Sequence, residues 1–263
     1  DLVIGIGGGA ITDLAGFAAA SWLRGLDWVA VPTSLAGMVD ASVGGKTGIN
    51  SDYGKNLIGA FHSPIAVIID TAFLKTLSDR DFSAGMAEVI KCGFIADRKI
   101  LDVAIAHTVD SVRRNPDVIS ELIHRAVMVK AQVVSSDFKE SFAREVLNYG
   151  HTLGHAIEIH AKYQLRHGEA VAIGLVYAAE LAAARGLITA IELDLHRTIL
   201  VAYKLPITFD RQAWQKLAPL LALDKKARGN TIRFVALNGI GSTIRLEDLT
   251  STELDAAYER ISS

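Results

Sequence analysis

The first twenty-three residues constrain the fold more than any other part of the chain. Residues 2–6, LVIGI, are a short apolar run that meets three glycines at positions 7–9, and residues 10–23, AITDLAGFAAASWL, have the composition and spacing of a helix. Strand, glycine turn and helix in this order open a nucleotide-binding βα unit, where glycines let a pyrophosphate approach the amides of a helix N-terminus. The turn lacks the full G-x-G-x-x-G pattern, so a tight turn without a ligand stays open as an alternative.

Two further strands are expected, at residues 27–32 and 65–70. DWVAVP ends at Pro32, and IAVIID is almost continuously apolar, which is typical of a parallel strand buried on both faces. Helices and loops separate the three strands, and this arrangement favours a parallel sheet.

The spacing of the apolar residues changes near residue 78, where SDRD resembles a capping box that opens a helix. From there to about residue 205 apolar residues recur at helical spacing, most clearly at 83–96, 117–137 and 169–186. Residues 231–246 are expected to form a hairpin with Gly239 and Gly241 in its turn. We therefore predict an α/β domain in residues 1–77 and a mainly helical domain in residues 78–263.

The composition narrows the class of protein. Half of the 263 residues are apolar, enough for a large core, and the net charge of −2 indicates neither a nucleic acid nor a membrane as partner. One cysteine, Cys92, suits a reducing compartment. No signal peptide is expected from these residues, and they contain no apolar run of the ~20 residues that a membrane span needs. Because the chain opens at Asp1 in the middle of a pattern, we expect that residues upstream are missing.

A glycine-rich loop carries an unusual number of polar groups. VGGKTG at 43–48 resembles a Walker A loop, but that motif needs a glycine at position 40, which is Asp40, so a P-loop is rejected. Asp40, Lys46, Lys55 and Asn56 nevertheless lie within one short stretch. Binding groups and an ordinary solvated loop are both compatible with this density.

Two histidines four residues apart raise the question of a metal site. On a helix, His151 and His155 would lie about 40° apart on one face, with Arg144 and Asn148 on roughly the same side. One short helix could then present all four to one cavity. Gly150 and Gly154 weaken a helix, which suggests that another element packs close to the backbone. A packed helix with two incidental imidazoles is the competing interpretation.

A catalytic zinc usually takes three protein ligands from histidine and carboxylate and leaves one position open. His151 and His167 could be two of them. Glu88 stands out as the carboxylate, because it is an acid in an apolar helical stretch, although a Glu88–Lys91 pair within the helix would explain it too. Spacing alone does not choose Glu88 over three other acids: Glu145, Glu158 and Glu169.

Six segments, taken together, resemble the 3-dehydroquinate synthase family. They are GGGAITDLAGFAAASWLRG, VPTSLAGMVDASVGGKTGIN, GKNLIGAFHSP, FSAGMAEVIKCGFI, LNYGHTLGHAIE and HGEAVAIGL. Their order and spacing match that family, and their residues resemble those of its actinobacterial branch. The resemblance implies a Rossmann-like NAD-binding α/β domain, incomplete here, followed by a mostly helical metal- and substrate-binding domain. It implies a phosphate-eliminating lyase of the shikimate pathway that turns 3-deoxy-D-arabino-heptulosonate 7-phosphate into 3-dehydroquinate, with NAD and a divalent metal, zinc or cobalt.

The family's site residues fall on matching positions of this chain. The metal ligands implied are Glu88, His151 and His167, and His155 becomes a proton-transfer or hydrogen-bonding group near the reacting centre. The catalytic groups implied are His155, Lys91, Lys46, Asn148 and Arg144. The substrate-binding groups implied are Asp40, Lys46, Asn56, Lys91, Lys130, Arg144, Asn148, His155, Lys226 and Arg24.

The resemblance also implies contacts to NAD and a setting for the protein. The NAD-binding positions are Gly8, Gly9, Asp13, Thr33, Ser34, Lys46, Lys55, Phe73, Leu74, Lys75 and Thr76. Arg24 matches an arginine delivered across a dimer interface, so a cytoplasmic homodimer is expected. Three alternatives remain: another sugar phosphate cyclase, a metal- and NAD-dependent enzyme like glycerol dehydrogenase, and a truncated remnant without activity.

Overall fold

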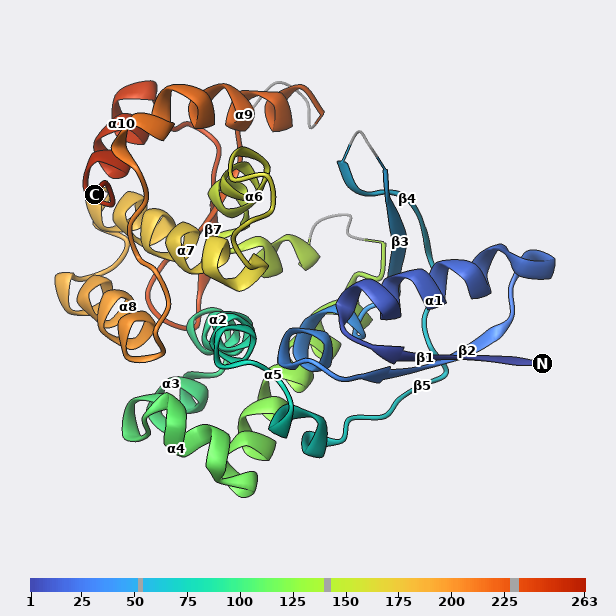
Figure 1. Ribbon diagram of the computed structural model, residues 1–263. Coiled ribbons are helices and arrows are strands. Elements are labelled where there is room, and N and C mark those ends of the chain that lie inside the picture. The colour runs from blue at the N-terminus through green and yellow to red at the C-terminus, as the bar shows by residue number, and fades with distance from the viewer. Residues whose placement is uncertain (52–53, 140–142, 228–231) are drawn as a thin grey trace. The chain divides into compact units, whose positions relative to one another are not determined.

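The computed structural model describes residues 1–51, 54–139, 143–227 and 232–263, and it leaves the side chains of residues 52–55 and 222–231 undescribed. Its contacts divide the chain into two compact units (Figure 1), and each unit is made of two segments. The first comprises Asp1–Val89 and Ser111–Arg144, and the second comprises Ile90–Asp110 and Glu145–Ser263. The boundary expected after residue 77 assumes two consecutive segments, and as a functional boundary it stays a prediction.

The first unit contains a parallel sheet in the order β1–β2–β5. β1 (Leu2–Gly7) pairs with β2 (Asp27–Pro32) along its whole length, from Leu2 opposite Asp27 to Gly7 opposite Pro32. The predicted helix after the glycines is α1 (Gly9–Ser21), which runs along β1 and β2 in Figure 1. Ala19 of α1 and Trp28 and Ala30 of β2 form the core between helix and sheet. The βα unit expected from the sequence is therefore present.

The third expected strand is present but shorter and less buried than predicted. Only β5 (Ala66–Val67) pairs with β2, although the sequence suggested a strand over 65–70. Ile65 and Ile68 are 63% and 55% exposed, so the expected burial on both faces is wrong. A continuous apolar run shows that a segment can be buried, but only covering elements bury it, and α1 covers one face of this sheet.

An antiparallel ribbon completes the strands of the first unit. β3 (Lys46–Ser51) pairs with β4 (Gly54–Phe61). The GKT sequence therefore leads into a strand and not into a helix, which agrees with the rejection of a P-loop. The remaining elements that lie wholly in this unit are the short helical turns η1 (Trp22–Arg24), η2 (Gly37–Ala41) and η3 (Thr71–Lys75), and the helix α5 (Pro116–Ser136).

Helix α2 (Asp79–Ile95) begins where the capping pattern predicts. The Ser78 hydroxyl oxygen accepts a hydrogen bond from the Asp81 backbone N–H at 3.1 Å, and the hydroxyl donates to the Asp81 carboxylate at 2.6 Å. Because these contacts satisfy an N–H group that has no partner within the helix, they fix its start. The division between the units falls within α2, and also within α4 (Val109–Arg114) and η4 (Ala143–Asn148).

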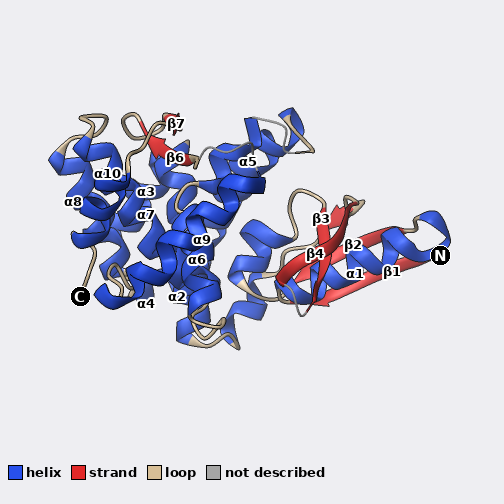
Figure 2. Ribbon diagram, turned by 90° about the horizontal axis from the view of Figure 1, so that it is seen from above, coloured by secondary structure: helices blue, strands red, loops and turns tan. Residues whose placement is uncertain are grey.

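The second unit is built around α7 (His167–Ala184), in which every residue from Gly168 to Ala182 is buried. A helix that is apolar on all sides belongs inside a domain, and this one does. Its other elements are α3 (Arg98–Ala106), α6 (His151–His160), α8 (Ala190–Ala202), η5 (Arg211–Ala213), α9 (Trp214–Ala227), β6 (Phe234–Leu237), β7 (Thr243–Leu246) and α10 (Ser251–Glu259). Figure 2 shows the short β6–β7 pair among the helices of this unit. This pair is the predicted hairpin, with Gly239 and Gly241 at positive φ in its turn.

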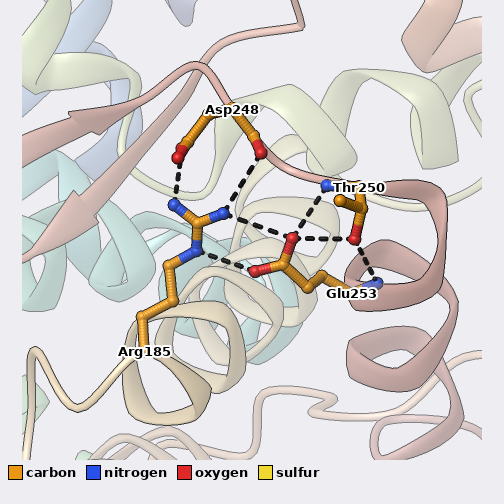
Figure 3. A network of polar contacts seen from close by, with 4 residues as sticks. All are labelled: Arg185, Asp248, Thr250 and Glu253. Atoms are coloured by element: carbon orange, nitrogen blue, oxygen red, sulfur yellow. Dashed lines mark hydrogen bonds and ion pairs between the residues drawn. The ribbon is translucent and has the colours of Figure 1, made fainter.

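A polar network ties the end of α7 to the start of α10 (Figure 3). The Arg185 guanidinium donates to the Glu253 carboxylate at 2.8 Å and to the Asp248 carboxylate at 2.5 Å. Glu253 also accepts hydrogen bonds from the backbone and hydroxyl of Thr250, so the capping box of α10 and the ion pair share one carboxylate. The described helices include none that is long and apolar enough to cross a membrane.

Candidate active site

Three histidine rings meet where α6 and α7 begin in the second unit. His151 is the first residue of α6, His155 lies one turn later, and His167 is the first residue of α7. The ring centroids are 5.3 Å apart for His151 and His155, 5.2 Å for His151 and His167, and 6.1 Å for His155 and His167. His151 is 8% exposed, whereas His155 is exposed. The fold thus brings together histidines that the sequence separates by up to sixteen positions.

Two of these rings are oriented through their Nδ1 atoms. His151 Nδ1 lies 3.2 Å from the Tyr149 backbone oxygen, and His167 Nδ1 lies 3.1 Å from a Glu158 carboxylate oxygen. Both partners accept hydrogen bonds, so in the neutral rings Nδ1 carries the proton and Nε2 keeps its lone pair. A histidine held in this way offers Nε2 to a metal ion.

The four acids that the sequence left open differ in what they contact. Glu145 pairs with Arg245 at 2.5 Å, and Glu169 accepts the backbone N–H of Arg166 at 2.9 Å at the start of α7. Glu88 is 2% exposed and lies on α2, a continuous helix that passes into the second unit two residues later. Among the described residues, two sets offer ligand atoms within 4.8 Å of one another: Glu88, His151 and His167, and His155, Glu158 and His167.

The close approach of α6 and α7 explains the glycines around the histidines. Gly150 has φ of +79°, a left-handed conformation that glycine adopts without strain, and it is the N-cap of α6, two residues after η4 ends at Asn148. A Cβ atom at Gly174 of α7 would lie 1.9 Å from the Gly150 oxygen. The prediction that another element packs against this backbone is therefore confirmed.

The expected single helix carrying Arg144, Asn148, His151 and His155 is wrong. Arg144 and Asn148 lie on η4, and the left-handed turn at Gly150 separates them from α6. Asn148 is half-buried in the second unit. Its neighbour Leu147 accepts a hydrogen bond at 2.8 Å from Nζ of Lys91, which is 2% exposed. Lys91 therefore contacts the backbone directly before Asn148, within the second unit.

In the first unit two polar pairs lie beside α1. Asn56 Nδ2 donates to the Asp13 carboxylate at 3.1 Å, and Lys130 Nζ lies 2.5 Å from both a carboxylate oxygen and the backbone oxygen of Asp40. Burial raises the pKa of Asp13 to about 6, and the charge of Asp40 adds to this while the Asn56 hydrogen bond and the charge of Lys130 oppose it. Four predicted site residues therefore share one electrostatic environment.

Arg144 is 2% exposed and belongs to the first unit. Its Nη1 donates to the backbone oxygens of Gly44 at 3.0 Å and Phe138 at 2.8 Å. These contacts fix the guanidinium beside the glycine-rich loop that the sequence singled out.

The glycine turn has the features of an anion-binding helix start. Gly8 is the N-cap of α1, and no side chain caps this end. A Cβ atom at Gly8 would lie 3.4 Å from the Ser34 hydroxyl, which accepts the Gly37 N–H at 3.2 Å. Thr33 donates its N–H to the Gly7 oxygen at 2.8 Å. The backbone of Gly8 and Gly9 and the hydroxyl of Ser34 are therefore neighbours at the C-terminal edge of the parallel sheet, the edge where such sheets bind ligands.

The other expected positions occupy varied environments. Phe73, Leu74, Lys75 and Thr76 lie at the end of η3, where Leu74 is buried and its oxygen accepts from Arg113 at 3.3 Å. Lys46 is exposed at the start of β3, and Arg24 is exposed in η1 with φ of +71°. The side chains of Lys55 and Lys226 lie outside the described residues.

His196 and Tyr149 were not predicted as site residues from the sequence. His196 Nε2 lies 2.9 Å from the Tyr149 hydroxyl, and its Nδ1 lies 2.7 Å from the Glu192 backbone oxygen. The ring is fully buried and stacks on Phe94 at 3.6 Å, and burial lowers the pKa of His196 to about 4. A neutral His196 therefore anchors the residue whose backbone oxygen orients His151, and a lone histidine on an apolar helix face carries no sequence signal for this.

Comparison with known proteins gives a consistent match over the whole chain. Residues 1–84 match the model of the 3-dehydroquinate synthase N-terminal domain, and residues 85–227 match the model of the C-terminal domain. The 3-dehydroquinate synthase of Paenarthrobacter aurescens (strain TC1) is 54% identical over 263 residues, which are 100% of this chain and 72% of the relative.

Solved structures of two related enzymes superpose closely. One is ValA, a 2-epi-5-epi-valiolone synthase from Streptomyces hygroscopicus subsp. jinggangensis 5008 with NAD+ and Zn2+ bound, with a TM-score of 0.91, 31% identity, and coverage of 99% of this chain and 72% of that chain. The other is a 2-deoxy-scyllo-inosose synthase complexed with carbaglucose-6-phosphate, NAD+ and Co2+, with a TM-score of 0.86, 26% identity, and coverage of 98% and 73%.

Proposed function

The chain belongs to the 3-dehydroquinate synthase family, and from that premise we propose that it converts 3-deoxy-D-arabino-heptulosonate 7-phosphate to 3-dehydroquinate and phosphate. The reaction is the elimination of phosphate by a carbon–oxygen lyase of the shikimate pathway. The proposal rests on two observations together: the family match over residues 1–227, and two histidines of the second unit, His151 and His167, whose Nδ1 atoms each lie beside an oxygen acceptor.

Another sugar phosphate cyclase is the second candidate, because ValA and 2-deoxy-scyllo-inosose synthase have this fold. The identities favour the first candidate, at 54% to a 3-dehydroquinate synthase against 31% to ValA. In this proposal the substrate's carboxylate and phosphate call for several cations, and Lys91, Lys130 and Arg144 are each buried and held by hydrogen bonds to oxygen acceptors.

The donor set fits a divalent metal. Glu88, His151 and His167 provide one carboxylate and two imidazoles, the ligand types of a catalytic zinc that keeps a position open. When bound, the metal would polarise substrate hydroxyl groups, and NAD would accept a hydride and return it. His155 is the exposed member of the histidine cluster, and in this proposal it passes protons or hydrogen-bonds the substrate near pH 7.

The start of α1 fits the pyrophosphate of NAD. The N-terminal amides of a helix attract anions, and Gly8 and Gly9 present no side chain that would keep a phosphate away. The proposed NAD-binding set is Gly8, Gly9, Asp13, Thr33, Ser34, Lys46, Lys55, Phe73, Leu74, Lys75 and Thr76. The proposed substrate-binding set is Asp40, Lys46, Asn56, Lys91, Lys130, Arg144, Asn148, His155, Lys226 and Arg24, with His155, Lys91, Lys46, Asn148 and Arg144 as its catalytic members.

The proposal includes a homodimer in the cytoplasm. Arg24 stands in an exposed turn beside Trp22 and Leu23, which are 63% and 67% exposed, and an arginine flanked by large apolar groups is typical of an interface. The single cysteine, Cys92, is compatible with a reducing compartment.

The test is phosphate release from 3-deoxy-D-arabino-heptulosonate 7-phosphate with NAD and Zn2+. Release should require NAD, disappear in His151→Ala and persist in His160→Ala, a matched change on the same helix outside the histidine cluster. Release from a different sugar phosphate alone would support the second candidate. A folded, zinc-loaded chain that binds NAD weakly and releases nothing would support the inactive alternative.

A further inference from the structure

Glu158 has a place in the histidine cluster that differs from that of a ligand. It lies near the end of α6 and is 3% exposed, and its carboxylate lies 3.1 Å from Nδ1 of His167 at the start of α7. The short connection between the two helices folds back so that residues nine apart in sequence meet. Nδ1 and Nε2 lie on opposite sides of the imidazole ring, so the Nε2 atom of His167 points away from Glu158.

The two metal-facing rings are oriented by unlike partners. His151 Nδ1 faces a neutral backbone oxygen, whereas His167 Nδ1 faces a carboxylate. A buried carboxylate that accepts a ring N–H fixes the tautomer and orientation of the ring, and it makes the opposite nitrogen more basic. His167 needs such help more than His151 does, because its side chain is 32% exposed and packing restrains it less, whereas His151 is buried.

We propose that Glu158 is a positioning residue for the metal site: its carboxylate holds His167 with Nδ1 protonated and Nε2 turned toward the metal. This rests on the proposed metal set of Glu88, His151 and His167. Glu158 acts through His167 and does not itself bind the metal. It is the orienting partner of one ligand, and it differs from Glu169, which has the same side chain but caps the backbone of α7.

The experiment is a Zn2+ titration against a chromophoric chelator, made on Glu158→Gln, Glu169→Gln and the unchanged protein. Glutamine keeps the size of the side chain and removes the charge. We expect Glu158→Gln to weaken Zn2+ binding by about 10- to 100-fold, the usual effect of losing an orienting carboxylate. Glu169→Gln, two residues from His167, should stay within about threefold. Equal affinities for Glu158→Gln and the unchanged protein would overturn the proposal.

The visible spectrum of the Co2+ form separates positioning from ligation. We expect Glu158→Gln to keep the band positions and intensities of the unchanged protein once it is saturated, because no ligand is lost. A spectrum altered as in His167→Ala would make Glu158 a ligand and overturn the proposal.

A further measurement needs no variant and so does not depend on Glu158→Gln folding. In the metal-free protein, ¹⁵N NMR of the His167 ring should show Nδ1 protonated and Nε2 bare, and the opposite tautomer would overturn the proposal. The proposed function fails separately: an unchanged protein that binds Zn2+ tightly and shows the expected Glu158 effect, yet releases no phosphate, would refute the reaction and leave the role of Glu158 standing.

Discussion

In the second unit, His151 and His167 stand at the first residues of two helices whose backbones touch at Gly150 and Gly174, and each ring has a fixed Nδ1 partner. In the first unit, Gly8 and Ser34 lie in turns at the edge of a sheet, and the polar pairs Asp13–Asn56 and Asp40–Lys130 join loop and helix. Helix packing determines the first arrangement, whereas side-chain pairs and backbone turns determine the second. Substitutions should therefore have different consequences in the two places.

The largest effect is expected where the helices of the second unit touch. Gly174→Ala would place a Cβ atom 1.9 Å from the Gly150 oxygen, so α6 and α7 must move apart. We expect the free energy of unfolding to fall by about 3 kcal/mol or more, since overpacking against a backbone has no flexible side chain to yield. Urea denaturation measures this. A loss below about 1 kcal/mol would show that the helices adjust easily and would weaken the contrast between the units.

Loss of the network in Figure 3 should have the next largest effect. Arg185 pairs with Glu253 and Asp248 in a partly exposed setting, with side-chain exposures of 23%, 31% and 78%. We expect Arg185→Ala to lower the free energy of unfolding by about 1.5 kcal/mol, because one guanidinium joins two carboxylates. Arg211→Ala, which removes an exposed pair with Glu259, is the matched control and should cost less than about 0.5 kcal/mol.

The same network predicts that the protein loses stability as the pH becomes acidic. Hydrogen bonds from Arg185 and then from Thr250 lower the pKa of Glu253 from its ordinary value of 4.5 to about 2. A carboxyl whose pKa is lower in the folded state stabilises the protein above its unfolded pKa, and the contribution is lost as pH falls from about 4.5 to 2. Thermal melts across this range should show a smaller decline in Arg185→Ala than in the unchanged protein. Parallel curves would contradict the role of this pair.

In the first unit, Gly8→Ala should leave the stability nearly unchanged and weaken the binding of NAD. The added Cβ atom would lie 3.4 Å from the Ser34 hydroxyl, an ordinary contact, but it would stand at the proposed pyrophosphate site. We expect the Kd for NAD to rise about tenfold, or ~1.4 kcal/mol, with less than about 0.5 kcal/mol lost in stability. Unchanged NAD affinity would remove Gly8 from the proposed site.

The smallest effect is expected from Asp13→Asn, and it should depend on pH. Burial raises the pKa of Asp13 from 3.8 to about 6, so the folded state binds a proton more tightly than the unfolded state does. Stability from this group is therefore greatest at low pH and declines as pH rises from about 4 to 6. At pH 7 Asp13→Asn should be more stable than the unchanged protein by about 1 kcal/mol, after allowance for partial exposure, and equal to it at pH 4. A variant that is less stable at pH 7 would contradict this account.

Local sequence patterns predict much of the fold but less of the candidate site. The βα unit, the start of α2 at Ser78 and the helices α5 and α7 follow from capping and apolar spacing, which act over a few residues. The burial of 65–70 could not be read in this way, because it depends on which elements cover the sheet.

The residues of the histidine cluster could likewise be predicted only in part from local sequence patterns. His151 and His167 could be selected from the sequence, but spacing could not choose among four acids. The contact of Glu158 with His167 depends on how the end of α6 and the start of α7 meet. The separation of Arg144 and Asn148 from α6 depends on one left-handed glycine, Gly150. Such choices are made by tertiary packing and leave no periodic trace in the sequence.

The central claim is that Glu88, His151 and His167 hold the metal, and not the neighbouring set of His155, Glu158 and His167. The most direct test is the zinc content of the purified protein and of Glu88→Gln, His151→Ala, His167→Ala and His155→Ala, measured by elemental analysis after dialysis against a weak chelator. We predict about one zinc per chain in the unchanged protein and in His155→Ala, and little in the other three. Zinc retained by Glu88→Gln and lost from His155→Ala would contradict the account and assign the metal to the other set.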